Sequence, residues 1–243
     1  MEDVHAKLPA GERPAGTRRS FLARAAGTGL ILAGGGVGRA DEPEEEVTAT
    51  EDLMREHGVL RRILIVYSET AAKLRRDAAA VDAKAVAAAA TLFRDMGEQY
   101  HERMLEEQHV FPAVRRAGGE AAKLVDTLEA QHRRGREITA FLLDATKRGS
   151  IGAVAGEAVA GAMEGMVRMY RSHAAREDTV VFPAWKETLS RTELDELGEQ
   201  FEEIEHQQLG ADGYEHAVET VARVEKTLGL DSLAVFTAPA PPA

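Results

Sequence analysis

Two stretches of the chain repeat a pattern of residue types that could bind a metal. His173 stands four residues before Glu177, and His101 stands five residues before Glu106. Each glutamate is followed five residues later by the phenylalanine of a Phe-Pro step. Because the chain has no cysteine, any bound metal must take nitrogen and oxygen ligands, which suit iron or manganese and are also compatible with zinc. The two stretches therefore predict two halves of one metal site.

Two further histidines, His57 and His132, fit the same site by their height along the expected helices. Counted from the turns, histidines on consecutive helices differ in height by three to five residues, or roughly 5–8 Å at 1.5 Å per residue. A lone histidine on an apolar helix face is commonly a packed core residue. Four unpaired imidazoles at one height would be costly to bury, so the set favours a metal site over simple packing.

The chain after residue 48 favours helix, because Ala, Leu, Glu, Lys and Arg dominate between breaks at Gly and Pro. Thr48 with Glu51 forms a capping-box pattern, and Asp82 is an expected N-cap. Short connections make neighbouring helices antiparallel. The expected fold class is all-α, an up-down-up-down antiparallel four-helix bundle with C-terminal appended helices. The four helices are expected over about residues 48–80, 83–118, 120–148 and 151–189.

The composition divides the chain into five parts. The appended region opens with a second capping-box pattern, Ser190 with Glu193, and the chain ends in a Pro-rich stretch. The expected parts are an export signal at 1–40, an acidic linker at 41–48, the bundle at 49–189, appended helices at 190–230 and a disordered Pro/Ala tail at 231–243.

The first part resembles a twin-arginine export signal. Arg18-Arg19 precedes a Gly-rich apolar run over residues 25–37. Gly38-Arg39-Ala40 follows, with small residues at the positions that a signal peptidase reads. The run is too short to span a bilayer as a stable helix, and no cysteine follows it to carry a lipid. We therefore expect export without a membrane anchor, to the periplasm or another extracytoplasmic space.

The net charge of the chain limits its partners. The formal charge is −11, and removing residues 1–40, with their six basic and three acidic side chains, lowers it to −14. Such an acidic protein disfavours nucleic acid and anionic lipid surfaces as partners.

The sequence also contains an internal repeat. Glu56-His57 resembles Gln131-His132 at an offset of 75 residues, and His101 and His173 are 72 residues apart. A helix pair used twice, related by a pseudo-two-fold axis, is a natural way to surround a two-metal centre.

One histidine per helix, with a His-x-x-x-Glu motif before Phe-Pro, resembles the hemerythrin-like proteins, also called the HHE cation-binding domain. The resemblance covers about residues 50–190. It implies a four-helix bundle that holds two non-heme irons, with manganese or zinc as alternatives. The implied terminal ligands are His57, His101, His132 and His173, and the implied bridges are Glu106 and Glu177.

The sequence departs from the oxygen-carrying members at two points. Those members place a second histidine one turn from the third-helix ligand, where this chain has Leu128 and Arg136, so it is more similar to the bacterial four-His branch. That branch includes iron–sulfur cluster repair and nitric-oxide-responsive proteins. The five-residue spacing of the second-helix pair needs a π-turn to bring Glu106 into the site; otherwise Glu102 or Glu107 takes its place.

The resemblance implies a protein that binds or senses dioxygen, nitric oxide or peroxide. The alternative is an oxidoreductase of the oxidase, peroxidase or nitric oxide reductase type, which would need a redox partner protein. A zinc-binding or purely structural bundle is the third interpretation. We favour a binding protein over a dedicated enzyme. Tyr67, Tyr100 and Tyr170 are candidates for hydrogen bonds around the ligands or for simple packing.

Overall fold

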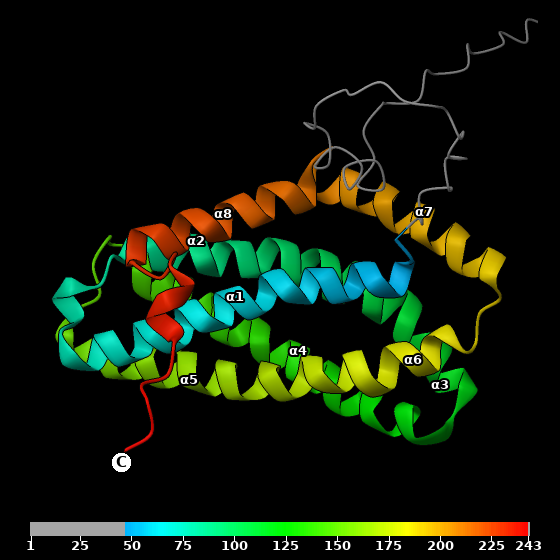
Figure 1. The fold of residues 1–243 in the computed structure, drawn as a ribbon, viewed down its shortest axis with the longest axis horizontal. Coiled ribbons are helices and arrows are strands. Elements are labelled where there is room, and N and C mark those ends of the chain that lie inside the picture. Colours follow the sequence, from blue (N-terminus) through cyan, green and yellow to red (C-terminus); the bar gives the residue numbers. More distant parts are fainter. Residues whose placement is uncertain (1–46, 243) are drawn as a thin grey trace, which may run out of the picture. The chain divides into compact units, whose positions relative to one another are not determined.

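The computed structural model describes residues 47–242. The expected export signal and most of the acidic linker therefore lie outside the described residues. Every regular element in the described part is a helix, which confirms the all-α prediction (Figure 1).

The first long helix, α1 (Ala49–Arg76), begins where the sequence predicts it. The Thr48 hydroxyl accepts a hydrogen bond from the Glu51 backbone N–H, and the Glu51 carboxylate accepts one from the Thr48 N–H at 2.9 Å. This capping box satisfies two N–H groups that would otherwise lack partners. The helix ends at Arg76 with Asp77 as its C-cap, and a short 3₁₀ turn, η2 (Ala78–Ala80), leads to the next segment.

The second segment is not one regular α-helix, although the sequence predicts one over residues 83–118. It starts at the N-cap Asp82 as α2 (Ala83–Leu92), continues as the π-helix η3 (Phe93–Val110) and finishes as α3 (Phe111–Ala117). The change of winding in the middle rotates the side chains of η3 relative to an ideal α-helix. It determines which carboxylates of this segment face the interior.

The remaining bundle segments are α4 (Gly119–Thr146) and α5 (Ala153–Arg176), the latter extended by a π-turn, η4 (Glu177–Val181), and by α6 (Phe182–Lys186). Helix α1 packs along α5, while α2 and η3 pack along α4, and α4 also contacts α5 (Figure 1). The four segments form a helical bundle with a continuous core between them.

Two helices follow the bundle and pack on its side. Helix α7 (Arg191–Leu209) starts with the predicted Ser190–Glu193 capping box and contacts η3, and α8 (Gly213–Leu228) lies against α1 and α2 (Figure 1). Beyond α8 the described chain contains one exposed 3₁₀ turn, η5 (Leu233–Phe236).

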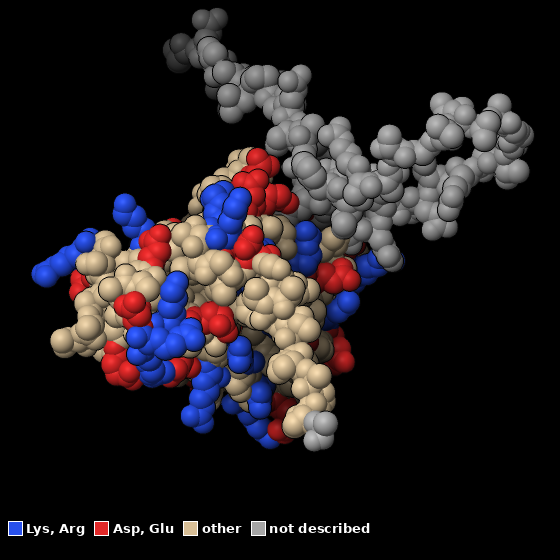
Figure 2. All heavy atoms as spheres, turned by 60° about the vertical axis from the view of Figure 1, so that its left-hand side comes forward, with Lys and Arg blue, Asp and Glu red and all other residues tan. Residues whose placement is uncertain are grey.

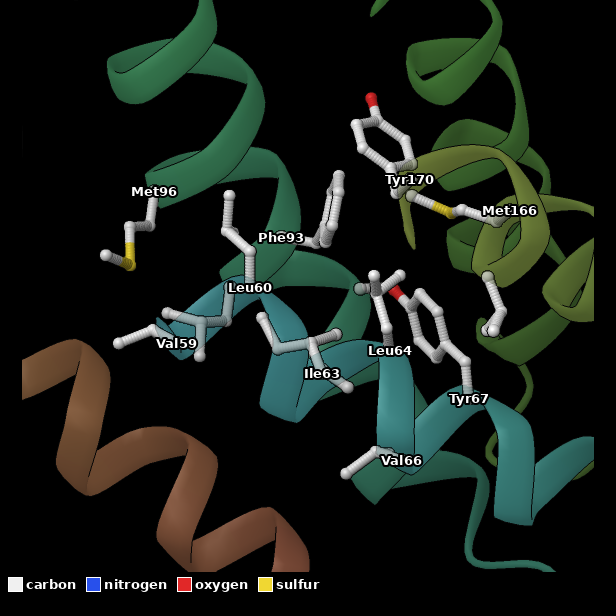
Figure 3. Packing of buried hydrophobic residues seen from close by; sticks show 14 of the residues in the cluster. Val59, Leu60, Ile63, Leu64, Val66, Tyr67, Phe93, Met96, Met166 and Tyr170 are labelled. Carbon is white, nitrogen blue, oxygen red and sulfur yellow. The ribbon is translucent and has the colours of Figure 1, made fainter. Parts of the chain in front are cut away.

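The core beside the functional site is built from aromatic and branched side chains. Leu64 and Tyr67 of α1 point toward Phe93 of η3 and Tyr170 of α5 (Figure 3). The ring centroids of Tyr67 and Phe93 are 6.4 Å apart, and those of Phe93 and Tyr170 are 5.0 Å apart in an edge-to-face arrangement. Such aromatic contacts add to the stabilisation from area burial, so they fix η3 against α1 and α5.

One carboxyl group in this core should make stability depend on pH. Glu98 is only 3% exposed, and burial raises its pKa from 4.5 to about 7, with a further contribution from the negative charge of Glu102. A carboxyl whose pKa is raised by folding loses native stability as pH rises from the unfolded value to the folded one. We expect Glu98→Gln to stabilise the metal-free protein at pH 8 by about 2 kcal/mol relative to its effect at pH 5.

Urea unfolding at both pH values measures this difference, with the exposed Glu137→Gln as the matched control. An equal effect of Glu98→Gln at pH 5 and pH 8 would contradict the assignment.

The surface of the described part carries both charge signs. Figure 2 shows lysine and arginine interspersed with aspartate and glutamate on one face, with no large area of a single sign. None of the helices in the described residues is long and apolar enough to cross a membrane.

Candidate metal centre

Four buried histidines, one from each segment of the bundle, meet in its interior. They are His57 of α1, His101 of η3, His132 of α4 and His173 of α5. The imidazoles form two pairs through their inward nitrogens. The Nε2 atoms of His57 and His101 are 3.0 Å apart, and those of His132 and His173 are 3.1 Å apart. These pairs are called the His57/His101 position and the His132/His173 position below.

Two fully buried glutamates lie between the positions, and each offers one oxygen to each of them. Glu106 Oε1 is 3.4 Å from Nε2 of His101, and Glu106 Oε2 is 3.3 Å from Nε2 of His132. Glu177 Oε2 is 3.5 Å from Nε2 of His57, and Glu177 Oε1 is 3.0 Å from Nε2 of His173. Each of the two carboxylates thus lies close to both histidine pairs.

π-helical winding surrounds Glu106 and begins at Glu177. The backbone N–H of Phe111 bonds to the carbonyl of Glu106, and the N–H of Phe182 bonds to the carbonyl of Glu177, each five residues back. The π-turn predicted from the five-residue spacing of His101 and Glu106 is confirmed, although it extends over all of η3. The second π-turn at η4 was not predicted, because the four-residue spacing of its histidine and glutamate also suits an ordinary α-helix.

The phenylalanines of the two Phe-Pro steps have a role that the sequence did not reveal. Phe111 stacks on the imidazole of His132, with centroids 5.5 Å apart, and Phe182 stacks on that of His57 at 5.4 Å. The proline that follows each ring lies where the π-helical winding changes to α-helix. In each half, π-helical winding therefore connects a glutamate of the centre to an aromatic ring on the face of a histidine of another helix.

Each histidine is also held from behind through its Nδ1 atom. Sequence reasoning did not assign this role to the four side chains, which we call the Nδ1 acceptors; it considered Glu107 only as a possible metal ligand. Their positions in the sequence could have indicated this role, because each acceptor is adjacent in the chain to a residue of the centre. The pairs are His57 with Asp178 at 2.7 Å, His101 with Glu56 at 2.7 Å, His132 with Glu107 at 2.9 Å and His173 with Gln131 at 2.9 Å.

The Nδ1 contacts assign the proton of each neutral imidazole to Nδ1, since a carboxylate or amide oxygen can only accept. The inward Nε2 atoms then carry lone pairs. Two lone pairs facing each other at 3.0 Å repel unless a cation or a proton lies between them. The histidine pairs are thus arranged as donors to a positive charge.

The oxygens of the two central glutamates also need a positive charge close to them. All four oxygens of Glu106 and Glu177 are buried, and none has a hydrogen-bond donor within the described part of the chain. Unpartnered buried oxygens are rare in proteins and costly. Four lone-pair nitrogens and four such oxygens in one interior fit metal ions, and their ligand atoms form two groups within 4.8 Å that share Glu106.

The electrostatics agree with this donor set. Burial lowers the pKa of His132, but the negative charges of Glu102 and Glu106 outweigh it and raise the pKa to about 10. Burial raises the pKa of Glu106, yet the neighbouring His101 and His132 hold it well below the usual range. The centre therefore stabilises positive charge strongly.

The structure also distinguishes the three glutamates considered for the second segment. Only Glu106 points between the histidine pairs. Glu107 accepts from Nδ1 of His132, and Glu102 accepts from the Tyr170 hydroxyl at 2.7 Å and from Arg136 at 3.1 Å. Both lie behind the centre, where they orient other side chains.

The three tyrosines singled out in the sequence have different environments. The Tyr100 hydroxyl donates to Glu56 at 2.8 Å, and Tyr170 donates to Glu102. The Tyr67 hydroxyl is buried and has no hydrogen-bond partner among residues 47–242. Two of the three thus act through residues around the centre, and Tyr67 belongs to the packed core.

A small cavity lies beside the centre. Its volume is about 10 Å³, which is room for about one water-sized molecule. Leu60, Leu64, Phe93 and Ala174 supply apolar walls. The remaining lining residues are His57, Arg61, His101, Glu102, Glu106, Tyr170 and His173.

Gly135 makes room for Tyr170 next to this cavity. A Cβ atom at residue 135 would lie 2.1 Å from the Tyr170 hydroxyl oxygen, so the ring would have to leave its place on Glu102. We expect Gly135→Ala to lower the free energy of unfolding by about 1–3 kcal/mol, measured by urea unfolding.

Gly161→Ala in α5 is the matched control, since its Cβ would meet open space. It should stabilise the protein by about 0.5–1 kcal/mol through helix propensity. The same sign for both substitutions would contradict the close approach of Tyr170.

Comparisons with known proteins point to the same kind of site. A family model described as the hemerythrin HHE cation binding domain matches residues 48–185. An uncharacterized protein of Mycobacterium tuberculosis and one of Mycobacterium bovis are each 43% identical over 206 residues, covering 83% of this chain and 80% of theirs. No solved structure matches the chain significantly. The family match covers all six residues at the centre.

Proposed function

The chain belongs to the hemerythrin HHE cation-binding family, and from this premise we propose that it holds two non-heme iron ions in an antiparallel four-helix bundle. One ion would be held at the His57/His101 position and the other at the His132/His173 position. Glu106 and Glu177 would be shared between them. Manganese and zinc suit the same nitrogen and oxygen ligands.

The observation that carries this proposal is the set of buried carboxylate oxygens without donors. Each oxygen of Glu106 and Glu177 lies opposite an inward imidazole nitrogen, at distances from 3.0 to 3.5 Å. A structural bundle without metal would leave this set uncompensated. Metal ions compensate all of these donors at once.

The cavity supports a small oxidant or diatomic molecule as the ligand. Bound iron would supply coordination positions for dioxygen, nitric oxide or peroxide. A volume of about 10 Å³ and walls of Leu60, Leu64 and Phe93 exclude larger molecules and limit water near the centre. We therefore propose that the protein binds or senses such a molecule.

Anaerobic loading with Fe(II) followed by one equivalent of dioxygen, nitric oxide or hydrogen peroxide tests this function. A stable optical spectrum of an adduct supports binding. Repeated turnover with an electron donor would instead support the alternative oxidoreductase, and no spectral change with any of the three ligands would contradict both.

Leu64→Phe makes the same experiment more specific, because the larger ring reduces the cavity without removing any metal ligand. We expect this variant to keep its iron and to lose most of its ligand binding. Unchanged ligand binding would show that the cavity is not the ligand site.

We further propose that residues 1–40 direct export through the twin-arginine route to an extracytoplasmic space. The support is the sequence alone: Arg18-Arg19, the apolar run and the cleavage-like residues 38–40 occur in the expected order. Fusing residues 1–45 to a reporter and changing Arg18 and Arg19 to Lys tests the proposal. Unchanged export of the Lys–Lys fusion would contradict it.

The binding partners are likewise proposed from the sequence. We propose a small ligand rather than nucleic acid, on the basis of the acidic net charge. A redox partner protein is needed only if the centre turns over.

A further inference from the structure

The internal repeat of the sequence extends to the side chains that hold the histidines. Glu56 precedes His57 and accepts from the Nδ1 of His101 on the neighbouring segment. Seventy-five residues later, Gln131 precedes His132 and accepts from the Nδ1 of His173 in the same way. The two halves of the centre are thus built by one rule.

The other Nδ1 acceptors also follow the repeat. Asp178 follows Glu177 and holds His57, and Glu107 follows Glu106 and holds His132. An arginine at the repeat-related positions 61 and 136 pairs with each of these carboxylates. The stacked phenylalanines correspond as well, at 5.4 and 5.5 Å.

Gln131 is the point at which the two halves differ in charge among the Nδ1 acceptors. The His57/His101 position is backed by two carboxylates, Asp178 and Glu56. The His132/His173 position is backed by one carboxylate, Glu107, and by the neutral amide of Gln131.

An arginine stands behind each position. Arg136 is 19% exposed and contacts both Glu102 and Glu107, whereas Arg61 is 42% exposed and pairs with Asp178. Arg136 is shared between two carboxylates and neutralises the equivalent of one of them, as Arg61 does for Asp178. The difference between the halves therefore rests on Gln131 itself. Glu102 lies 3.9 Å from Nδ1 of His132, beyond hydrogen-bond distance, and its charge is shared with the same Arg136.

The acceptor behind a ligand histidine changes the strength of that ligand. A carboxylate that accepts the Nδ1–H makes the imidazole a stronger donor to a cation than an amide does, and altering such a contact typically changes metal affinity 10–100-fold. His101 has the carboxylate and His173 has the amide.

We propose that Gln131 makes the two metal positions unequal, so that the His57/His101 position binds a divalent cation first and the His132/His173 position second. The inference rests on the proposed two-metal function and adds an order of binding to it. His173 is the most weakly donating of the four ligands, so the second position also releases its cation first.

Zinc titration of the metal-free full chain, followed by ¹⁵N NMR of the imidazoles, tests the order. Zinc is diamagnetic and needs no electron supply, so it reports on the protein ligands alone. The first equivalent is expected to shift the Nε2 signals of His57 and His101, and the second those of His132 and His173. Signals are assigned from single histidine-to-asparagine variants.

Two isosteric substitutions test the cause. Gln131→Glu should tighten the second binding step about 10-fold, and Glu56→Gln should weaken the first by about the same factor. Gln200→Glu, which adds a charge on an exposed residue of α7, should change neither. Circular dichroism of the metal-free variants verifies that each one folds.

Several results would overturn the inference. A first response from His132 and His173, an equal response of both pairs, or an unchanged second step in Gln131→Glu would each exclude it while leaving a two-metal site in place. A wild-type chain that binds no zinc and no iron would instead remove the proposed function itself.

Discussion

Replacing Glu177 with alanine is expected to reduce the bound metal from about two ions per chain to one or none. Glu177 offers one oxygen to each histidine pair, at 3.5 Å from His57 and 3.0 Å from His173. Its loss therefore weakens both positions, whereas the loss of a single histidine affects mainly one. Optical titration of the anaerobic, metal-free protein with Co(II) measures the stoichiometry and the affinity of each step.

Glu187→Ala is the matched control, because this glutamate is exposed and lies beyond α6. It should bind Co(II) as the wild type does. Two tight Co(II) ions in Glu177→Ala would show that this carboxylate is not shared between the positions.

Replacing Trp185 with alanine is expected to lower the free energy of unfolding by about 3–5 kcal/mol. Trp185 is 1% exposed and stacks on Phe201 of α7, with ring centroids 5.9 Å apart and planes within 6°. The substitution removes a large side chain from the junction of the bundle and the appended helix. Urea unfolding of the metal-free protein measures the loss without a contribution from bound metal.

Phe141→Ala is the comparison for this effect, because Phe141 is also aromatic but is 42% exposed. It should change stability by no more than about 0.5 kcal/mol. A loss of similar size in both variants would indicate that α7 does not share the core of the bundle.

Much of the fold could be predicted because its signals are local. Thr48 with Glu51, Asp82, and Ser190 with Glu193 mark helix starts through contacts over two or three residues, and the structure shows all three caps. The distorted winding near Glu106 was also accessible, since a five-residue spacing does not fit one face of an α-helix.

The residues behind the histidines could not be predicted in the same way. Glu56 and Asp178 are adjacent to ligands in sequence, but each one contacts a histidine on a different segment. Such contacts depend on how the helices pack against one another, and this packing cannot be inferred from a single sequence. The second π-turn and the stacking of Phe182 on His57 were missed for the same reason.

The interior of the bundle thus contains buried polar groups that would each lower stability without a partner. Bound cations would give all of these groups a partner. Four imidazoles have their Nδ1 protons directed outward, and two carboxylates are buried without donors among the described residues. The surrounding helices, the π-turns and the stacked phenylalanines hold these groups in place.

Iron content after anaerobic reconstitution of the full chain with Fe(II) tests the central claim most directly. Elemental analysis of the desalted protein should give about two irons per chain. A value of one or below, in a protein that circular dichroism shows to be folded, would contradict a two-metal centre shared by Glu106 and Glu177.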